Sequence, residues 1–324
     1  MKIAIFTDTF LPQINGVTNT LRMMMQYFLE NGIVYKLFSP HYENMETDYP
    51  NVERFFSVPI FFYPECRLAL PKKKTITSSL LSFNPDVILI MTEFTMGLTG
   101  MHLAQKFSIP VISNYSTNIS QYTGYYKIPF LKQAVWDFMR KFHSKAEVTL
   151  CPSNEARSLL EQQGFKNTAV FSRGIDPNLF SPEYRNSELR KQWRAHGKTV
   201  LLYVGRVSPE KDLDILIESY NAVYKDFKKQ IILVITGDGP LIKKCKNLLP
   251  SDTIFTGFKK GAALSQIYAS SDIFICPSST ETFGNVVLEA MASGCAVIGC
   301  NAGGIGGIIK NRYNGIKFRI RDSK

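Results

Sequence analysis

The 324-residue chain lacks several patterns that would assign it to a protein class at once. It has no uninterrupted run of about 18 apolar residues, so the sequence predicts no transmembrane helix. Its six cysteines form no C-x-x-C pair and several lie in apolar runs, which indicates buried thiols rather than a disulfide framework or a zinc site. Neither G-x-S-x-G nor G-x-G-x-x-G occurs, so a serine-hydrolase elbow is excluded and an NAD-type oxidoreductase lacks its glycine fingerprint.

Charge and the N-terminus narrow the choice of partners and compartment. The formal net charge is +11, which favours anionic partners such as phosphates, anionic lipid or nucleic acid. No strip of interleaved basic and aromatic residues of the kind that reads nucleic acid is present, so we expect no nucleic-acid partner. The opening MKIAIFTDTF is typical of a first strand rather than a signal peptide, and with reduced cysteines it predicts a cytoplasmic protein.

Short apolar strands alternate with helical patterns in two successive series. The first series starts at KIAIF (2–6) and the second at TVLLYVG (199–205), with the polar segment 176–198 between them as a linker. This alternation predicts an α/β protein whose parallel sheets are covered on both faces. We expect two Rossmann-like domains, residues 1–178 and 179–324, that face each other across an interdomain cleft.

Two cations follow the first strand of the second series. In LLYVGRVSPEKDL, Arg206 and Lys211 come after the strand and before the next helix, so both should project from the carboxyl edge of the sheet. Two fixed cations there suit a diphosphate, which arginine can bind in a bidentate manner. A surface pair around a Ser-Pro turn explains the same spacing equally well.

A glutamate inside an apolar helix marks the stretch SSTETFGNVVLEAMASG (278–294). The pattern predicts a largely buried helix that begins near 284 or 285 and ends at Gly294, with Glu289 within it. A buried carboxylate requires hydrogen-bond donors, either from a ligand's hydroxyl groups or from elsewhere in the fold. Glu281 lies in the loop before this helix. The free N–H groups from Phe283 to Val286 lie between the two carboxylates and form a rim for an anion or a hydroxyl group.

Two further stretches bear on phosphate and metal binding. In TDTFLPQINGVTNT, Gly16 stands just ahead of a helix, where a glycine lets the backbone approach a phosphate closely. The DLD at 212–214 matches the aspartate pattern of metal-dependent sugar transferases, but it opens an amphipathic helix. No His, Cys and carboxylate cluster has the spacing of metal ligands, and we expect neither a metal nor a cofactor.

Together these residues resemble the retaining glycosyltransferases of family four, which have the GT-B fold of two facing Rossmann-like domains. The resemblance covers almost the whole chain, and its most specific part is PSSTETFGNVVLEAMASGCAVIG, which is similar to the family's Glu-(seven residues)-Glu signature. VGRVSPEKDL, SRGIDPNLF and ITGDGP match in order and spacing. FLPQINGVTNT is similar to the subgroup that includes mannosyltransferases and sulfoquinovosyl- or glucosyl-lipid synthases.

The resemblance implies a metal-independent, retaining transfer of a hexose from a UDP- or GDP-linked sugar to a lipid or glycan acceptor. It implies that Arg206 and Lys211 hold the diphosphate, that Glu281 contacts the donor sugar and that Glu289 accepts the ribose hydroxyl groups. The other residues implied to bind the donor, mainly through the backbone, are Gly16, Phe283, Gly284, Asn285 and Val286.

The chain departs from the family pattern at three places. Ser116 stands where the family usually has a histidine near the sugar, and Gly306 and Gly307 stand where it usually has Pro-Glu. The sequence also stops at Lys324, before the C-terminal helix of its relatives. These departures keep a second hypothesis open, namely a catalytically impaired homologue that binds a nucleotide sugar or supports a partner enzyme.

Two basic segments concern the acceptor. The amphipathic pattern at 129–145 combines aromatic and basic residues, which is typical of a helix on an anionic membrane surface and equally of a helix packed on a sheet. The cluster PKKKT (71–75) reads as a solvated loop. With the subgroup resemblance, a lipid or lipid-linked acceptor is expected, and with it a peripheral position at the inner face of the membrane as an alternative to a freely cytoplasmic one.

Overall fold

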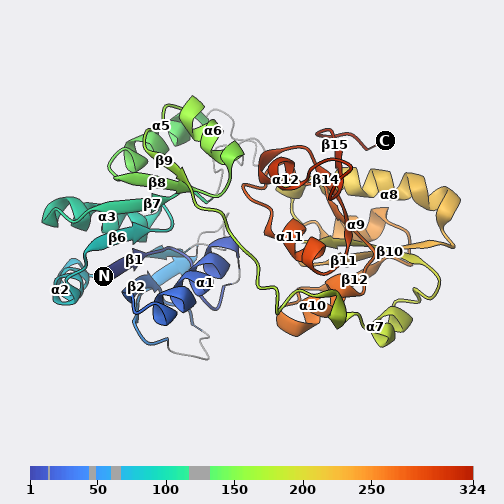
Figure 1. Cartoon of the computed structure of the whole chain (residues 1–324), viewed down its shortest axis with the longest axis horizontal. Coiled ribbons are helices and arrows are strands. Elements are labelled where there is room, and N and C mark those ends of the chain that lie inside the picture. Colours follow the sequence, from blue (N-terminus) through green and yellow to red (C-terminus); the bar gives the residue numbers. More distant parts are fainter. Residues whose placement is uncertain (14, 44–48, 60–66, 117–131, 324) are drawn as a thin grey trace. The chain divides into compact units, whose positions relative to one another are not determined.

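A computed structural model describes residues 1–13, 15–43, 49–59, 67–116 and 132–323, and Figure 1 shows its elements. The described residues up to Ser172 form one compact unit, and those from Arg173 onward form a second. Each unit contains a parallel sheet, which confirms the α/β class predicted from the alternating strands and helices.

The first unit is built on a seven-stranded sheet in the order β3-β2-β1-β6-β7-β8-β9. All described pairs in it are parallel. Its strands are β1 (Lys2–Phe6), β2 (Val34–Pro40), β3 (Val52–Phe55), β6 (Val87–Ile90), β7 (Val111–Asn114), β8 (Val148–Cys151) and β9 (Thr168–Val170). Its helices are α1 (Gly16–Glu30), α2 (Lys73–Phe83), α3 (Thr95–Phe107), α5 (Lys132–His143) and α6 (Asn154–Gln162).

Both faces of the first sheet are buried, and β1 shows how. Ala4 and Phe6 join a cluster with residues of α2 and α3, whereas Ile3 and Ile5 point the other way into a cluster with α1. A strand that is apolar at every position is what a sheet covered on both faces requires. The continuous apolar run IAIF (3–6) is therefore explained by burial of both faces.

A short antiparallel pair, β4 (Ser57–Pro59) and β5 (Arg67–Ala69), accompanies this sheet and was not predicted. Three-residue strands carry too little periodicity to be recognised in a sequence. The prediction of a solvated loop at 71–75 was partly wrong, because α2 begins at Lys73. The predicted helix at 129–145 corresponds to α5, and residues 129–131 lie outside the described residues.

Asp8 organises the carboxyl end of β1. Its buried carboxylate accepts hydrogen bonds from the backbone N–H of Met96 at 2.7 Å and from the hydroxyl groups of Thr92 and Thr95 at 2.8 and 3.0 Å. Burial raises the pKa of Asp8 to about 6, and these hydrogen bonds oppose that rise. The loop after β1 is thereby fixed to the first turn of α3.

The second unit is built on a six-stranded parallel sheet in the order β12-β11-β10-β13-β14-β15. Its strands are β10 (Thr199–Val204), β11 (Ile231–Thr236), β12 (Ile254–Gly257), β13 (Ile273–Cys276), β14 (Ala296–Cys300) and β15 (Ile316–Phe318). Its helices are α7 (Ser187–Gln192), α8 (Leu213–Phe227), α9 (Ile242–Leu248), α10 (Gly261–Ala269), α11 (Asn285–Ala292) and α12 (Gly303–Ile308), and two 3-10 turns are η2 (Pro182–Tyr184) and η3 (Pro209–Lys211).

This sheet is also covered on both faces. Val200 and Leu202 of β10 pack into a cluster with α10, α11 and α12, while Leu201 and Tyr203 face a cluster with α8 and α9. In Figure 1 these five helices flank the strands of the second unit.

The polar segment 176–198, expected as a linker, instead forms part of the second unit. Phe180 and Trp193 are buried in its core. Arg185 and Arg190 both bind the carboxylate of Asp272, at 2.7 and 2.9 Å. The charged residues that made the segment look like a linker therefore anchor it to the sheet.

The structure agrees with the sequence on membrane-spanning helices and on the cysteines that it describes. Within the described ranges, no helix combines the length and the apolarity that crossing a bilayer requires. Cys66 lies outside the described residues, and the other five cysteines are free buried thiols, as predicted for them.

Candidate functional site

The carboxyl ends of β10 and β13 form the centre of one edge of the second sheet. These strands are neighbours, with β11 and β12 on one side and β14 and β15 on the other, so the strand order reverses between them. Ligands of open parallel sheets bind outside the strand ends at such a switch point. The loop 205–212 follows β10 and the loop 277–284 follows β13, so the structure brings the two stretches selected from the sequence to this point.

Arg206 is held by a carboxylate from its own loop. Its Nη2 lies 3.0 Å from Oε1 of the fully buried Glu210, and the Ser208 hydroxyl donates to the same oxygen at 2.6 Å. The Tyr203 hydroxyl donates to the Arg206 carbonyl at 2.8 Å, which fixes the backbone as well. The Glu210 carbonyl accepts a hydrogen bond from Thr280 Oγ1 at 2.9 Å, and this bond joins the two loops of the site.

Lys211 and Glu281 form a direct ion pair between the two loops. Lys211 Nζ lies 2.5 Å from Glu281 Oε1, and both side chains are mostly buried. Next to this pair, the Asp212 carboxylate accepts hydrogen bonds from the Ser279 N–H at 2.9 Å and from its hydroxyl at 2.7 Å. Asp214 is exposed on α8. The first aspartate of DLD thus ties two loops together, and the second faces solvent.

The charges around Glu281 keep it ionised. Burial alone would raise the pKa of its carboxyl, but neighbouring cations outweigh burial, and the pKa lies below its ordinary value. The cations are, in order of effect, Lys211, Arg173 and Arg206. Glu281 is therefore an acceptor for hydroxyl donors at neutral pH, within a group of three cations.

Helix α11 starts at the edge of this group. Gly284 precedes it with φ +100°, a left-handed conformation that favours glycine. The N–H groups of Asn285 and Val286 belong to the first turn, where the helix has no acceptors of its own for them. Among the described residues, Asn285 Oδ1 is buried without a hydrogen-bond partner. The helix is less buried than predicted, because only Val287 and Ala290 are fully buried.

Glu289 accepts a hydrogen bond from the Tyr268 hydroxyl, 2.9 Å from Oε2. Burial raises the pKa of Glu289 to about 6, the Tyr268 hydrogen bond opposes that rise, and the charge of Glu281 adds to it. Burial and the adjacent carboxylate raise the pKa of Tyr268 well above its ordinary value, so its hydroxyl remains a donor. The Tyr268 bond occupies Oε2 and leaves Oε1 as an acceptor. Glu289 can therefore bind a partner within the fold through one oxygen and a ligand through the other.

The glycines of AGGIGGII allow helix α12 to approach the site. The Gly304 N–H donates to the Glu281 carbonyl at 2.8 Å. A Cβ atom on Gly303 would lie 2.2 Å from the Glu281 carbonyl oxygen, and one on Gly304 would lie 2.3 Å from the Phe283 carbonyl oxygen. Only glycine fits at these two positions, so this stretch supports the loop that carries Glu281.

Two predicted positions lie in the first unit. Gly16 is the first residue of α1 rather than just ahead of it, because Asn15 is the N-cap. The Asn15 carboxamide oxygen accepts from the N–H groups of Val17 and Thr18, both at 3.0 Å, and no described residue accepts from the N–H of Gly16. Ser116 is buried just after β7, and Thr117 lies outside the described residues.

Sequence reasoning missed three residues of the site. Glu210 stands four residues after Arg206, and this spacing within one loop could have been used to find the pair. Arg173 lies in the quoted stretch SRGIDPNLF but was not singled out. Tyr268 comes from α10, and nothing in the sequence indicates its pairing with Glu289, which depends on tertiary packing.

Comparison with known proteins gives two family matches that together span nearly the whole chain. Residues 14–179 match Glycosyltransferase Family 4, and residues 185–324 match Glycosyl transferases group 1. A GDP-mannose-dependent alpha-mannosyltransferase of Mycobacterium tuberculosis is 32% identical over 328 residues, covering 99% of this chain and 84% of that protein. An alpha-monoglucosyldiacylglycerol synthase of Streptococcus pneumoniae is 31% identical over 317 residues, covering 92% and 70%.

A solved structure supports the fold. The crystal structure of HepE from Anabaena, in complex with UDP and glucose, superimposes with a TM-score of 0.77 and 21% identity, covering 100% of this chain and 87% of that one. The matches confirm the resemblance and the GT-B fold inferred from the motifs.

Proposed function

The chain belongs to glycosyltransferase family 4 and is a glycosyltransferase, and we propose that it moves a hexose from a nucleoside-diphosphate sugar to a lipid or glycan acceptor with retention of configuration. The observation that carries the proposal is the switch-point site of the second unit. There, Lys211 pairs with the carboxylate of Glu281 on the other loop, and Arg206, held by Glu210 of its own loop, adds to the positive charge around Glu281.

We assign the diphosphate of the donor to Arg206 and Lys211. When the sugar leaves, negative charge builds up on the diphosphate, and two cations fixed by buried carboxylates stabilise that charge. This stabilisation does not require a metal ion. The acceptor attacks on the face from which the diphosphate departs, so no side chain of the chain has to act as a nucleophile.

The remaining site residues orient the donor. Glu281, kept ionised by its cations, accepts hydroxyl groups of the sugar. Glu289 accepts the ribose hydroxyl groups on its Oε1 while Tyr268 holds Oε2. The backbone from Phe283 to Val286 lies at the start of α11, where N–H groups favour an oxyanion. Gly16, in the first unit, would offer its N–H to the phosphate.

We assign donor binding to residues 179–324 and the acceptor side to residues 1–178. The relatives named above include a GDP-mannose-dependent mannosyltransferase and a diacylglycerol-linked glucosyl synthase. The first name supports a nucleotide-linked hexose as the donor, and the second supports a lipid as the acceptor. We propose a UDP- or GDP-linked donor, and a cytoplasmic protein that acts at the inner face of a membrane.

A screen of donors tests this function. Thermal unfolding of the purified chain should shift upward with the UDP- or GDP-linked sugar that it uses, and ADP-sugars serve as a comparison. The same donor should then be hydrolysed slowly in the absence of an acceptor. Stabilisation without turnover would favour the impaired-homologue hypothesis raised by Ser116, and no stabilisation by any nucleotide sugar would contradict the assignment.

Glu289 predicts a pH dependence of nucleotide binding. Its pKa of about 6 means that it loses its charge as the pH falls through that value, and a protonated carboxyl is a poorer acceptor for ribose hydroxyl groups. Affinity for the nucleoside diphosphate should fall by up to about tenfold between pH 7.5 and pH 5 through this group alone. Isothermal titration of the wild type and of Glu289→Gln isolates the effect, because the titration of the ligand is common to both. An equally steep profile in Glu289→Gln would argue against the assignment.

A further inference from the structure

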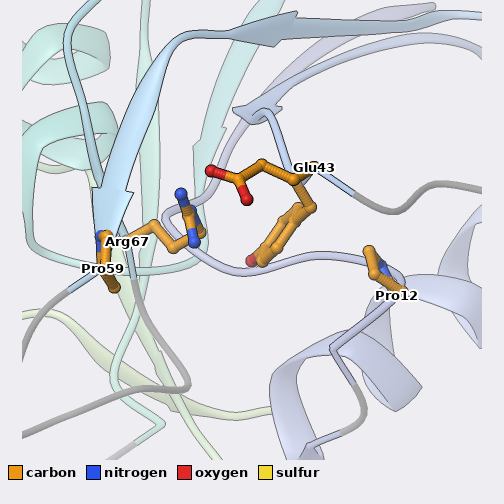
Figure 2. Close-up of a pocket in the computed structure, with 5 residues that line it drawn as sticks. Pro12, Glu43, Pro59 and Arg67 are labelled. Carbon is orange, nitrogen blue, oxygen red and sulfur yellow. The ribbon is translucent and has the colours of Figure 1, made fainter.

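A pocket in the first unit is not part of the donor site described above. It has a volume of about 340 Å³, and the described residues that line it are Pro12, Tyr42, Glu43, Pro59 and Arg67. Pockets of this size bind small ligands. Figure 2 shows the Arg67 and Glu43 side chains turned toward each other, with Pro12 on the far side of the pocket from Arg67.

The pocket lies at the edge of the first sheet where ligands are expected. Pro12 belongs to the loop after β1, and Tyr42 and Glu43 follow the carboxyl end of β2. Arg67 is joined to the same edge, because its backbone N–H donates to the backbone carbonyl of Asp8 at 3.0 Å. Ligands of parallel sheets bind outside the carboxyl ends of the strands, and this pocket lies at that edge, beside the switch point between β1 and β6.

The guanidinium of Arg67 is held rigidly. Its Nε donates to the Ser57 hydroxyl at 2.7 Å and its Nη2 donates to the Ser57 carbonyl at 2.9 Å. The Ser57 hydroxyl donates in turn to the His41 carbonyl at 2.6 Å. The guanidinium also lies over the ring of Tyr42, 5.3 Å from its centroid. An arginine fixed in this way is preorganised to bind a ligand with little loss of side-chain entropy.

Among the residues that the structure describes, the guanidinium of Arg67 keeps donors to spare. Its two bonds to Ser57 use two of its five N–H donors, and no described residue accepts from Nη1. Within the described part of the chain, no carboxylate forms an ion pair with it, Glu43 included. A fork of donors with a fixed positive charge selects phosphate, sulfate or carboxylate groups.

Glu43 adds a second requirement. It is exposed at the rim of the same pocket, and a carboxylate accepts hydrogen bonds from hydroxyl groups but repels a second negative charge. A ligand that satisfies both side chains carries one anionic group next to hydroxyl groups. We propose that this pocket is the acceptor subsite for an anionic, hydroxyl-bearing group, with the anion on Arg67 and a hydroxyl on Glu43.

The proposal rests on the transferase function only in that the ligand is called an acceptor, and binding can be measured without any transfer. The probe is sn-glycerol 3-phosphate, with glycerol as the uncharged comparison, titrated into the full chain by calorimetry. We expect glycerol 3-phosphate to bind and glycerol not to bind. Arg67→Gln should weaken binding at least about tenfold, because it removes a charge-assisted pair.

Three further variants make the test specific. Glu43→Ala should weaken binding of glycerol 3-phosphate, because it removes the acceptor for the ligand's hydroxyl group from an exposed position. Arg22→Gln removes the same charge from an exposed position on α1 and should leave binding unchanged. If Arg67→Gln fails to fold, Arg67→Lys retains the charge without the fork and should bind at intermediate strength. No binding by the wild type, or equal binding by Arg67→Gln, would overturn the proposal.

A second experiment distinguishes a lipid headgroup from a free polyol phosphate as the source of the anionic group. Vesicles of phosphatidylglycerol in phosphatidylcholine present the same glycerophosphate chemistry on a lipid. If the vesicles displace glycerol 3-phosphate from the wild type, the ligand is a lipid headgroup. If the vesicles do not displace it, the ligand is a free polyol phosphate. Binding of UDP or GDP to the second unit, measured on the same variants, should not change. If the wild type binds glycerol 3-phosphate but binds neither UDP nor GDP, the transferase function is contradicted and the pocket proposal is not.

Discussion

Glutamine in place of Lys211 should lower the rate of donor hydrolysis by roughly a hundredfold, the loss typical when one preorganised group at a developing charge is removed. The amide keeps most of the length of the side chain but cannot neutralise the diphosphate as it leaves. The variant also deprives Glu281 of its nearest cation, 2.5 Å away in the wild type. The pKa of Glu281 should therefore rise, and the activity of the variant should decline more steeply below neutral pH than that of the wild type.

The control for this prediction is Lys225→Gln, which removes the same charge from an exposed position on α8 of the same unit and should leave turnover unchanged. Initial rates of donor hydrolysis and thermal unfolding are measured on both variants, so that a loss of activity is not mistaken for a loss of structure. Arg206→Gln should behave like Lys211→Gln. A chain that carries both substitutions and hydrolyses its donor at the wild-type rate would contradict the assigned role of the two cations.

The fold was predictable because most of its sheet strands contain a short run of consecutive apolar residues. Residues 3–6 and 200–204 point alternately to the two covered faces of their sheets, so each stretch is apolar at every position. The β4–β5 pair was not predictable, because each strand has three residues and its antiparallel pairing depends on contacts with the rest of the unit. The segment 176–198 was misread for a related reason, since its arginines are polar in the sequence but bind Asp272 in the fold.

The candidate site was predictable in its outline and not in its partners. Arg206, Lys211, Glu281 and Glu289 follow from spacing and from the resemblance, and the structure brings them to one switch point. What holds them is set by distant residues. Tyr268 reaches Glu289 from 21 residues away, and Ser279 reaches Asp212 across 67 residues, separations at which a sequence pattern carries no information on contact.

Gly304→Ala should disturb the donor site by pushing against the backbone of the loop that carries Glu281. The new Cβ atom would lie 2.3 Å from the carbonyl oxygen of Phe283 and 2.4 Å from its Cα atom, and backbone atoms cannot yield as a flexible side chain can. We expect the second unit to lose about 1–3 kcal/mol of unfolding free energy, as for other overpacked sites. Displacement of the loop from Glu281 to Phe283 should also weaken binding of the nucleoside diphosphate.

The matched control is Gly306→Ala, in the same helix. Its Cβ atom would lie 3.3 Å from the end of the Asn301 side chain, and alanine within a helix is favoured over glycine by about 0.5–1 kcal/mol. Because a chain of two units need not unfold in one step, the probe must report on the second unit alone. The chain has two tryptophans, and Trp193 is buried in that unit, so Trp136→Phe in every variant leaves Trp193 as the sole indole reporter. Urea unfolding followed by its fluorescence should separate Gly304→Ala from Gly306→Ala, and equal midpoints for the two variants would show that the close approach of α12 does not support the site.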